Sequence, residues 1–193
     1  MTQPNILFLV GESHAPDLLA AAGHPAIKTP NLDKLIARGT RFENALCVSP
    51  LCVPSRAALA TGAYPHETGY WDSSMAYDGR VPSWMKLLRD AGYHTAGIGK
   101  MHFRSDDDDV GFAQFEETMQ IAEGIGDLVS ALRHEGREPS YQGLWDIWTS
   151  RHEPGEDSPY RRYDERIAAA AETWMTGAPT DQPWSLSCLL YTS

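Results

Sequence analysis

A thiol and a guanidinium lie close together at residues 52–56, in the stretch Cys-Val-Pro-Ser-Arg. The segment 54–62 begins with proline and serine, continues with alanines and leucine and ends in glycine, which predicts a helix. Free N–H groups and the dipole at a helix N-terminus favour an anion, and Arg56 adds a fixed positive charge there. Cys52 is thus expected just before an anion-binding helix end. Four roles are open for it: buried packing, a metal ligand, a thiol nucleophile, or the precursor of another group.

Lys100 and His102 are the second group of residues with chemical potential, at the end of a predicted strand. Side chains two residues apart in an extended segment share a face, so these two are expected to point the same way. Taken alone, they are either a solvated lysine and an incidental histidine or groups that stabilise charge developing in a transition state. A further histidine, His66, occurs in the turn-like stretch Tyr-Pro-His-Glu-Thr-Gly. It either lines the pocket as a substrate-binding residue or caps or packs the turn.

Strands and helices must position these residues, and the two types of element alternate along the chain. Strands are predicted at 5–11 and 94–100, helices at 29–42 (with Thr29 as N-cap), 54–62, 81–93, 122–134 and 160–176, and polar loops or linkers at 104–111 and 150–160. The first strand is continuously apolar and is expected to be buried. The alternation indicates an α/β fold with a mainly parallel sheet flanked by helices. Ligands bind at the carboxyl ends of parallel strands, so Glu12, Cys52 and the Lys100–His102 segment are expected along one edge.

Composition excludes several classes of function. The formal net charge of −10 argues against a nucleic-acid-binding protein and requires any anion site to supply its own cations or metal. No apolar run reaches the length of a membrane span. No basic region followed by a long apolar stretch opens the chain, so a cytoplasmic location is expected. The 3 cysteines suit a reducing compartment and form neither a disulfide framework nor a zinc-ligand spacing.

Several ordered motifs resemble the sulfatase family, within the alkaline-phosphatase-like superfamily. The most specific is Cys-Val-Pro-Ser-Arg followed by Ala-x-Leu-x-Thr-Gly-x-Tyr-Pro-His-x-Thr-Gly. The resemblance runs from "NILFLV" to "LLRDAGYHTAGIGKMHF" and covers residues 5–103. It implies an alkaline-phosphatase-like sandwich, incomplete here because full members are longer. The residues 1–193 are therefore expected to be the N-terminal part of one catalytic domain, with 182–193 the start of a further strand and a tail of doubtful origin.

The resemblance also implies a mechanism. A separate formylglycine-generating enzyme oxidises the motif cysteine, here Cys52, to formylglycine, an aldehyde that hydrates to a gem-diol. Pro54 and Arg56 would belong to the recognition motif for this conversion, and Arg56 would then hold the modified residue. Lys100 and His102 match the family's Gly-Lys-x-His, which binds the sulfate and the hydrated aldehyde. A gem-diol can release its covalent adduct by elimination, whereas a serine adduct would need a second hydrolytic attack.

The metal site implied by the resemblance departs from the family's acidic pair. Aligned on the first strand, the metal positions fall on Glu12 and Ser13, with the modified Cys52 as a further ligand. Hard cations such as calcium prefer several charged oxygen ligands, so this site is expected to bind calcium weakly or to be rebuilt. The acidic run 106–109 lacks the spacing of a calcium loop and is expected to be solvated.

The function implied is hydrolysis of a small-molecule or saccharide sulfate ester. A phosphonate monoester or phosphodiester hydrolase of the same superfamily is the alternative enzyme, since it shares the cysteine motif. A non-catalytic, sulfatase-like fragment is the alternative from another class, since the second half of the active site cannot be identified in the chain.

Overall fold

The computed structural model describes residues 3–12, 14–121 and 158–191. Ser13, the helix expected at 122–134 and most of the linker expected at 150–160 lie outside the described residues. No helix among the described residues is long and apolar enough to cross a membrane.

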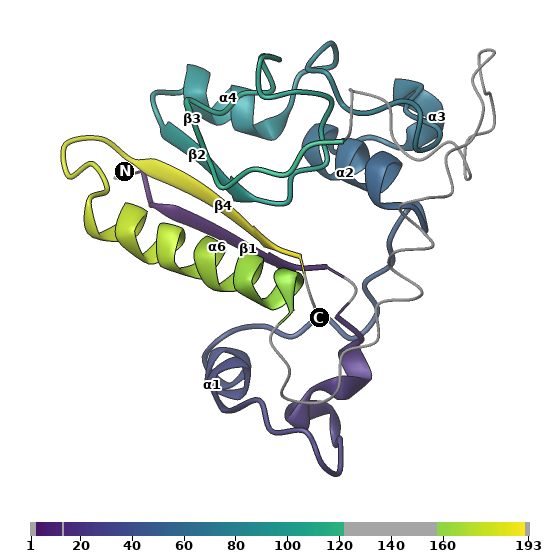
Figure 1. The fold of residues 1–193 in the computed structure, drawn as a ribbon, viewed down its shortest axis with the longest axis vertical. Coiled ribbons are helices and arrows are strands. Elements are labelled where there is room, and N and C mark those ends of the chain that lie inside the picture. The colour runs from purple at the N-terminus through teal and green to yellow at the C-terminus, as the bar shows by residue number, and fades with distance from the viewer. Residues whose placement is uncertain (1–2, 13, 122–157, 192–193) are drawn as a thin grey trace.

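A four-stranded parallel sheet forms the centre of the structure (Figure 1). Its strands are β1 (Ile6–Gly11), β4 (Trp184–Leu190), β2 (His94–Gly99) and β3 (Gln114–Glu116), in that spatial order. All three strand pairings are parallel. The α/β class with a parallel sheet flanked by helices is therefore confirmed. β4, the last described strand in the sequence, lies between the first two.

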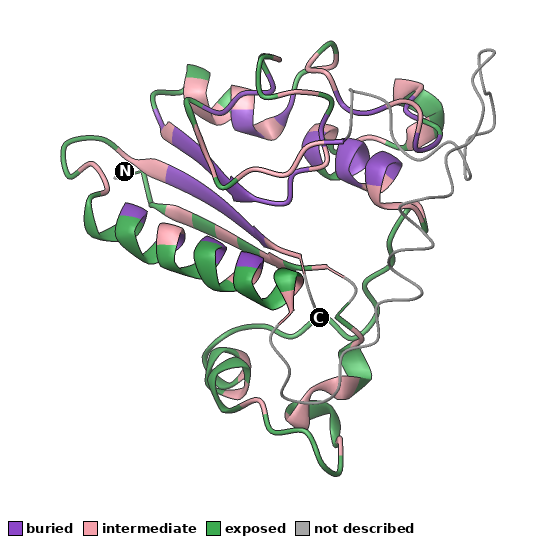
Figure 2. Cartoon of the chain, in the orientation of Figure 1, coloured by how far each residue is buried: buried purple, intermediate pink, exposed green. Residues whose placement is uncertain are grey.

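The helix α6 (Pro159–Thr176) covers one face of the sheet (Figure 1). Leu186 and Cys188 of β4 pack with Ile167 of α6, and Ile98 of β2 belongs to the same apolar cluster. These positions alternate along β4 because successive side chains of a strand point to opposite faces. This layer of the core is well buried, as the purple stripe along α6 in Figure 2 shows.

Two shorter helices, α2 (Cys52–Thr61) and α4 (Trp84–Asp90), lie on the other face. Ala57 of α2 and Met85 of α4 share a core cluster with Leu189 of β4. Ser83 is the N-cap of α4: its hydroxyl accepts a bond from the Lys86 N–H and donates one to the Val110 carbonyl, in the segment between β2 and β3. The helix expected at 81–93 thus begins later, at Trp84.

The strand β1 differs from its expectation. Its apolar run predicts burial on both faces, yet Leu7 and Leu9 are 49% and 53% exposed. β1 is an edge strand of the described sheet, paired only with β4, and α6 contacts β4 and β2 instead. The two leucines pair with Leu186 and Cys188, on the face that α6 covers further along the sheet. They extend that apolar face beyond the helix.

The other helices of the described residues all lie between β1 and β2 in the sequence. They are η1 (Pro16–Leu18), η2 (Ala20–Ala22), α1 (Pro30–Arg38) and α3 (Pro65–Thr68). α1 follows the expected Thr29 N-cap position, but the Thr29 hydroxyl makes no cap bond. It donates to Asp33 and accepts from the Ala20 N–H instead. No residue of α1 is buried.

Gly99, where β2 ends, requires a left-handed backbone with φ of +95° and leaves no space for a side chain. A Cβ there would overlap the Leu189 carbonyl oxygen of β4 and crowd Ile167 of α6. Gly92 has nearly the same φ, +91°, but a Cβ would meet nothing within 4 Å. Substitutions at these two glycines therefore distinguish the cost of backbone strain alone from the cost of strain with steric overlap.

We expect Gly92→Ala to lower the free energy of unfolding by about 1 kcal/mol, through backbone strain alone. Gly99→Ala should cost about 3 kcal/mol or more, because overlap with β4 and α6 adds to the strain. Urea denaturation of both variants and the wild type measures the difference. Equal losses would show that the contact at the end of β2 is not tight.

Candidate active site

The carboxyl ends of three strands bring charged and aromatic side chains to one edge of the sheet. Glu12 follows β1, Lys100 follows β2 and Tyr191 follows β4. Backbone bonds extend the pairing past the strand ends: the Glu12 N–H donates to the Leu190 carbonyl at 3.3 Å, and the Lys100 N–H to that of Leu189 at 3.0 Å. The expected edge location is where ligands bind in parallel sheets.

A nearly buried group of three charges lies at this edge. Lys100 Nζ forms a close ion pair with Glu12 Oε2, and Arg56 of α2 approaches Glu12 Oε1 at 3.8 Å. The side chains of Lys100, Arg56 and Glu12 are only 8%, 7% and 14% exposed. Glu12 Oε2 accepts no hydrogen bond among the described residues, so charge attraction rather than an aligned hydrogen bond holds the pair. We call Glu12, Arg56 and Lys100 the charge triad.

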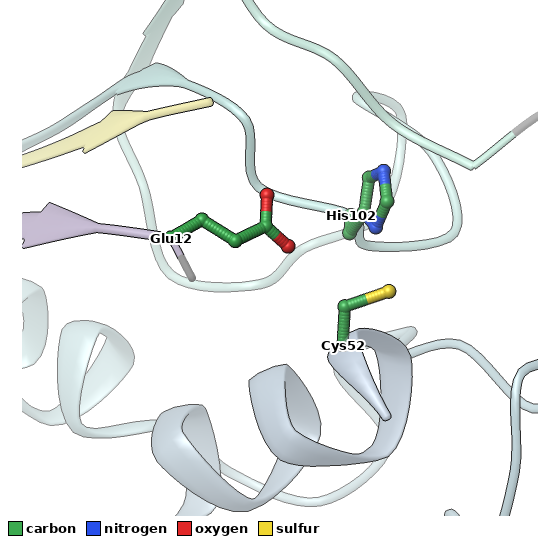
Figure 3. Close-up of side chains that lie close together, drawn as sticks. All are labelled: Glu12, Cys52 and His102. Atoms are coloured by element: carbon green, nitrogen blue, oxygen red, sulfur yellow. The ribbon is translucent and has the colours of Figure 1, made fainter. Parts of the chain in front are cut away.

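Cys52 lies beside the charge triad, as the first residue of α2 rather than just before the helix. The thiol sulfur, a carboxylate oxygen of Glu12 and a ring nitrogen of His102 all lie within 4.8 Å of one another. Figure 3 shows the three side chains converging from α2, the end of β1 and the segment after β2. These three side chains could hold a metal ion.

His102 reaches the site by a different route from the one expected. Its φ of 53° is left-handed, so the segment is not extended there, and strand periodicity does not explain its direction. Its N–H donates to the Met119 carbonyl at 3.0 Å, which fixes the turn. Burial, with the positive charges of Lys100 and Arg56, lowers the pKa of His102 to about 3. The imidazole is therefore neutral near pH 7, and its Nδ1 is buried with no partner among the described residues.

Two residues near the site were not identified from the sequence. Tyr191 places its ring centroid 4.1 Å from Lys100 Nζ, a cation–π contact, and its N–H bonds to Asp164 of α6 at 2.7 Å. It lies in the segment 182–193, whose tail was interpreted as doubtful. Its position directly after a predicted parallel strand is the sequence feature that could have identified it as a site residue.

Cys47 is the other such residue. It is exposed, and its sulfur lies 3.0 Å from the Ser49 carbonyl and 3.2 Å from the hydroxyl of Ser55, within the Cys52 motif. The hydrogen bond with Ser55, more than any other contact, lowers the pKa of the Cys47 thiol. The sequence gives no signal for this contact, since the two residues meet only because the loop turns back on α2.

Two other candidate positions do not belong to the group of three converging side chains. His66, in α3, is exposed and stacks on Tyr64 at 5.5 Å between ring centroids. The acidic run 106–109 is an exposed loop held by cations rather than a cation site: Asp109 accepts bonds from Lys86 and Arg89 of α4.

Calcium does not fit the donor atoms that the described residues offer before any modification of Cys52. Calcium takes six to eight oxygen ligands, whereas this group supplies one carboxylate, one thiol and one imidazole. The carboxylate is also engaged by Lys100 and Arg56.

We expect Glu12→Gln to lower the free energy of unfolding by about 3 kcal/mol, because it leaves Lys100 and Arg56 buried without their counter-charge. Asp109→Asn is the matched control. It removes the same kind of charge from two ion pairs, with Lys86 and Arg89, in which the aspartate is 54% exposed. It should cost about 1 kcal/mol or less. Urea denaturation compares the two, and a control as costly as Glu12→Gln would contradict the special role of burial.

Comparison with known proteins supports the resemblance seen in the motifs. Residues 4–193 match the family model described as Sulfatase. N-acetylglucosamine-6-O-sulfatase of Bacteroides thetaiotaomicron is 39% identical over 104 residues, covering 54% of this chain and 19% of that protein. Choline-sulfatase of Rhizobium meliloti is 37% identical over 112 residues, covering 58% of this chain and 22% of that protein. The chain thus spans about a fifth of the length of these curated relatives.

Solved structures agree on the fold. The structure of BT4656 with its substrate D-glucosamine-2-N,6-O-disulfate has a TM-score of 0.67 at 27% identity and covers 97% of this chain and 34% of that one. A phosphonate monoester hydrolase of Agrobacterium radiobacter has a TM-score of 0.65 at 19% identity, covering 97% and 41%, which shows the fold alone. The expected alkaline-phosphatase-like arrangement is confirmed as a partial chain. With the family match over 4–193, this shows that the chain belongs to the sulfatase family.

Proposed function

We propose that the whole protein is a sulfuric ester hydrolase that uses a formylglycine derived from Cys52. One observation carries the proposal: Cys52 begins α2 beside two nearly buried cations and the ring of His102. The relatives named as N-acetylglucosamine-6-O-sulfatase and choline-sulfatase support sulfate as the group removed. A chain with a net charge of −10 needs such local cations to bind an anion.

The substrate we propose is a saccharide sulfate ester. The first of those relatives is named for a sulfated sugar, and BT4656 was solved with a sulfated glucosamine. Arg56 and Lys100 would bind the sulfate oxygens, and the first-turn N–H groups of α2 would add to the positive field.

The proposed reaction has two steps. One hydroxyl oxygen of the hydrated aldehyde at residue 52 attacks the sulfur while the bond from sulfur to the alcohol oxygen breaks. The proton of the attacking hydroxyl passes to the departing alcohol oxygen. In the second step His102 takes the proton of the other hydroxyl, the carbonyl forms again, and the bond from carbon to the sulfate oxygen breaks. Sulfate leaves, and water rehydrates the aldehyde.

A divalent cation, calcium in our proposal, would be held only after this conversion. The sulfur of residue 52 is then replaced by oxygen, so Glu12 and the modified residue offer calcium the ligand type that it prefers. Ser13 is a further ligand in this proposal. When bound, such a cation supplies positive charge next to the sulfate.

The two alternatives have less support. The likeness to the phosphonate monoester hydrolase rests on 19% identity and concerns the fold alone, so it does not favour that activity. A non-catalytic role would leave the convergence of Cys52, His102 and the charge triad unexplained.

Co-expression with a formylglycine-generating enzyme should convert Cys52 and leave Cys47 as a thiol. Peptide mass spectrometry across residues 47 and 52 measures both in one sample. Conversion is expected only at residue 52, because only this cysteine begins the Cys-x-Pro-Ser-Arg motif. A persistent thiol at residue 52 would contradict the proposed mechanism.

On the full-length converted protein, Cys52→Ala should abolish hydrolysis of an aryl sulfate. Lys100→Ala should lower kcat by about 10²- to 10³-fold, the range for removal of one group that stabilises transition-state charge. His66→Ala serves as the control and should change kcat less than about threefold, as its ring is exposed and stacked on Tyr64. A larger effect of His66→Ala would place that residue in the site instead.

A further inference from the structure

The group formed by Cys52, His102 and Glu12 presents one sulfur, one nitrogen and one oxygen to a common point (Figure 3). The three ligand atoms lie within 4.8 Å of one another. In a tetrahedral zinc site, ligand atoms at the usual metal distances are about 3.3–3.8 Å apart. The ligand atoms would therefore have to come closer by at most about 1.5 Å to close around an ion.

The chemistry of these donors selects the ion. Zinc is bound by cysteine sulfur, histidine nitrogen and carboxylate oxygen, whereas calcium and magnesium are bound by oxygen. His102 supports this choice independently. Its Nδ1 is buried and has no hydrogen-bond partner among the described residues, so this nitrogen is available to a ligand.

We propose that the unconverted chain binds Zn²⁺ through Cys52, His102 and Glu12. Binding releases the thiol proton to solvent as the Zn–S bond forms, with no oxidation or reduction. A water molecule would complete a tetrahedral set. The site differs from the calcium site proposed for the converted enzyme, because it exists only while residue 52 carries sulfur.

The charge triad sets the strength of this binding. To bind the metal, Glu12 must give up part of its pairing with Lys100 and Arg56. The positive charges of these two residues also repel the metal ion. We therefore expect micromolar rather than nanomolar affinity. The three ligands come from separate elements, so binding also ties α2 to the sheet edge.

Zinc binding at this site would also affect the conversion of Cys52, a consequence that rests on the proposed function. A sulfur bound to zinc is withheld from the modifying enzyme, and conversion replaces that sulfur by oxygen. Zinc and conversion therefore exclude each other, and the loss of sulfur shifts the preference at residue 52 from zinc to hard cations.

Differential alkylation of the unconverted wild-type chain tests the proposal without any variant. The chain is treated with iodoacetamide with and without Zn²⁺, and the peptides carrying Cys47 and Cys52 are quantified by mass spectrometry. Zinc should slow alkylation of Cys52 by about tenfold or more and leave the exposed Cys47 unchanged. Equal protection of both cysteines, or protection of neither, would overturn the proposal.

Affinity measurements on variants locate the ligands. Zn²⁺ is titrated against a chromophoric chelator in the presence of wild type, Cys52→Ser, His102→Asn or the control Cys47→Ser, each checked for folding by circular dichroism. We expect about tenfold or greater weakening for the first two variants and none for the control. Wild-type affinity in folded Cys52→Ser would refute the assignment. Co²⁺ bound to wild type should show a thiolate-to-metal absorption band, and bound Co²⁺ without this band would also refute it.

A final arm separates this proposal from the proposed function. If residue 52 is converted, the converted chain should lose zinc affinity. If conversion fails, the formylglycine mechanism fails, while the alkylation result on the unconverted chain still decides whether the zinc site exists.

Discussion

The pairing of Glu12 with Lys100 and Arg56 is the interaction on which the site depends. It joins the ends of β1 and β2 to the first turns of α2, three segments far apart in the sequence. Charges that are nearly excluded from water are stable only when they are paired, so the three side chains hold each other in place. Cys52, one turn from Arg56, is positioned by the same contacts.

The same pairing limits what the site can offer an anion. Glu12 neutralises part of the positive charge of Lys100 and Arg56, so fewer than two full charges face a sulfate. Any cation bound at Glu12 would weaken its hold on both residues and leave more of their charge for the substrate. The identity of residue 52 then matters twice, since it supplies the nucleophile and also decides which cation Glu12 shares.

The sequence was sufficient for the type and order of most elements. The motif around Cys52, the apolar run of β1 and the Gly-Lys-x-His segment predicted a parallel sheet with its chemistry at one edge, which the structure has. What could not be predicted depends on long-range packing. The left-handed turn at His102 is set by the Met119 carbonyl, and the contact of Cys47 with Ser55 by the fold of a loop. Local patterns carry neither piece of information.

The exposed edge of β1 has a practical consequence for work with this chain. Leu7 and Leu9 continue an apolar sheet face into solvent, and along the outer edge of the described sheet β1 has backbone groups without a strand partner. Such an edge is a template for strand addition by another copy of the chain. Self-association of the chain must therefore be controlled before its chemistry is measured. Low protein concentration and light-scattering checks belong in each assay, because a self-associated sheet would bury the ends where the chemistry lies.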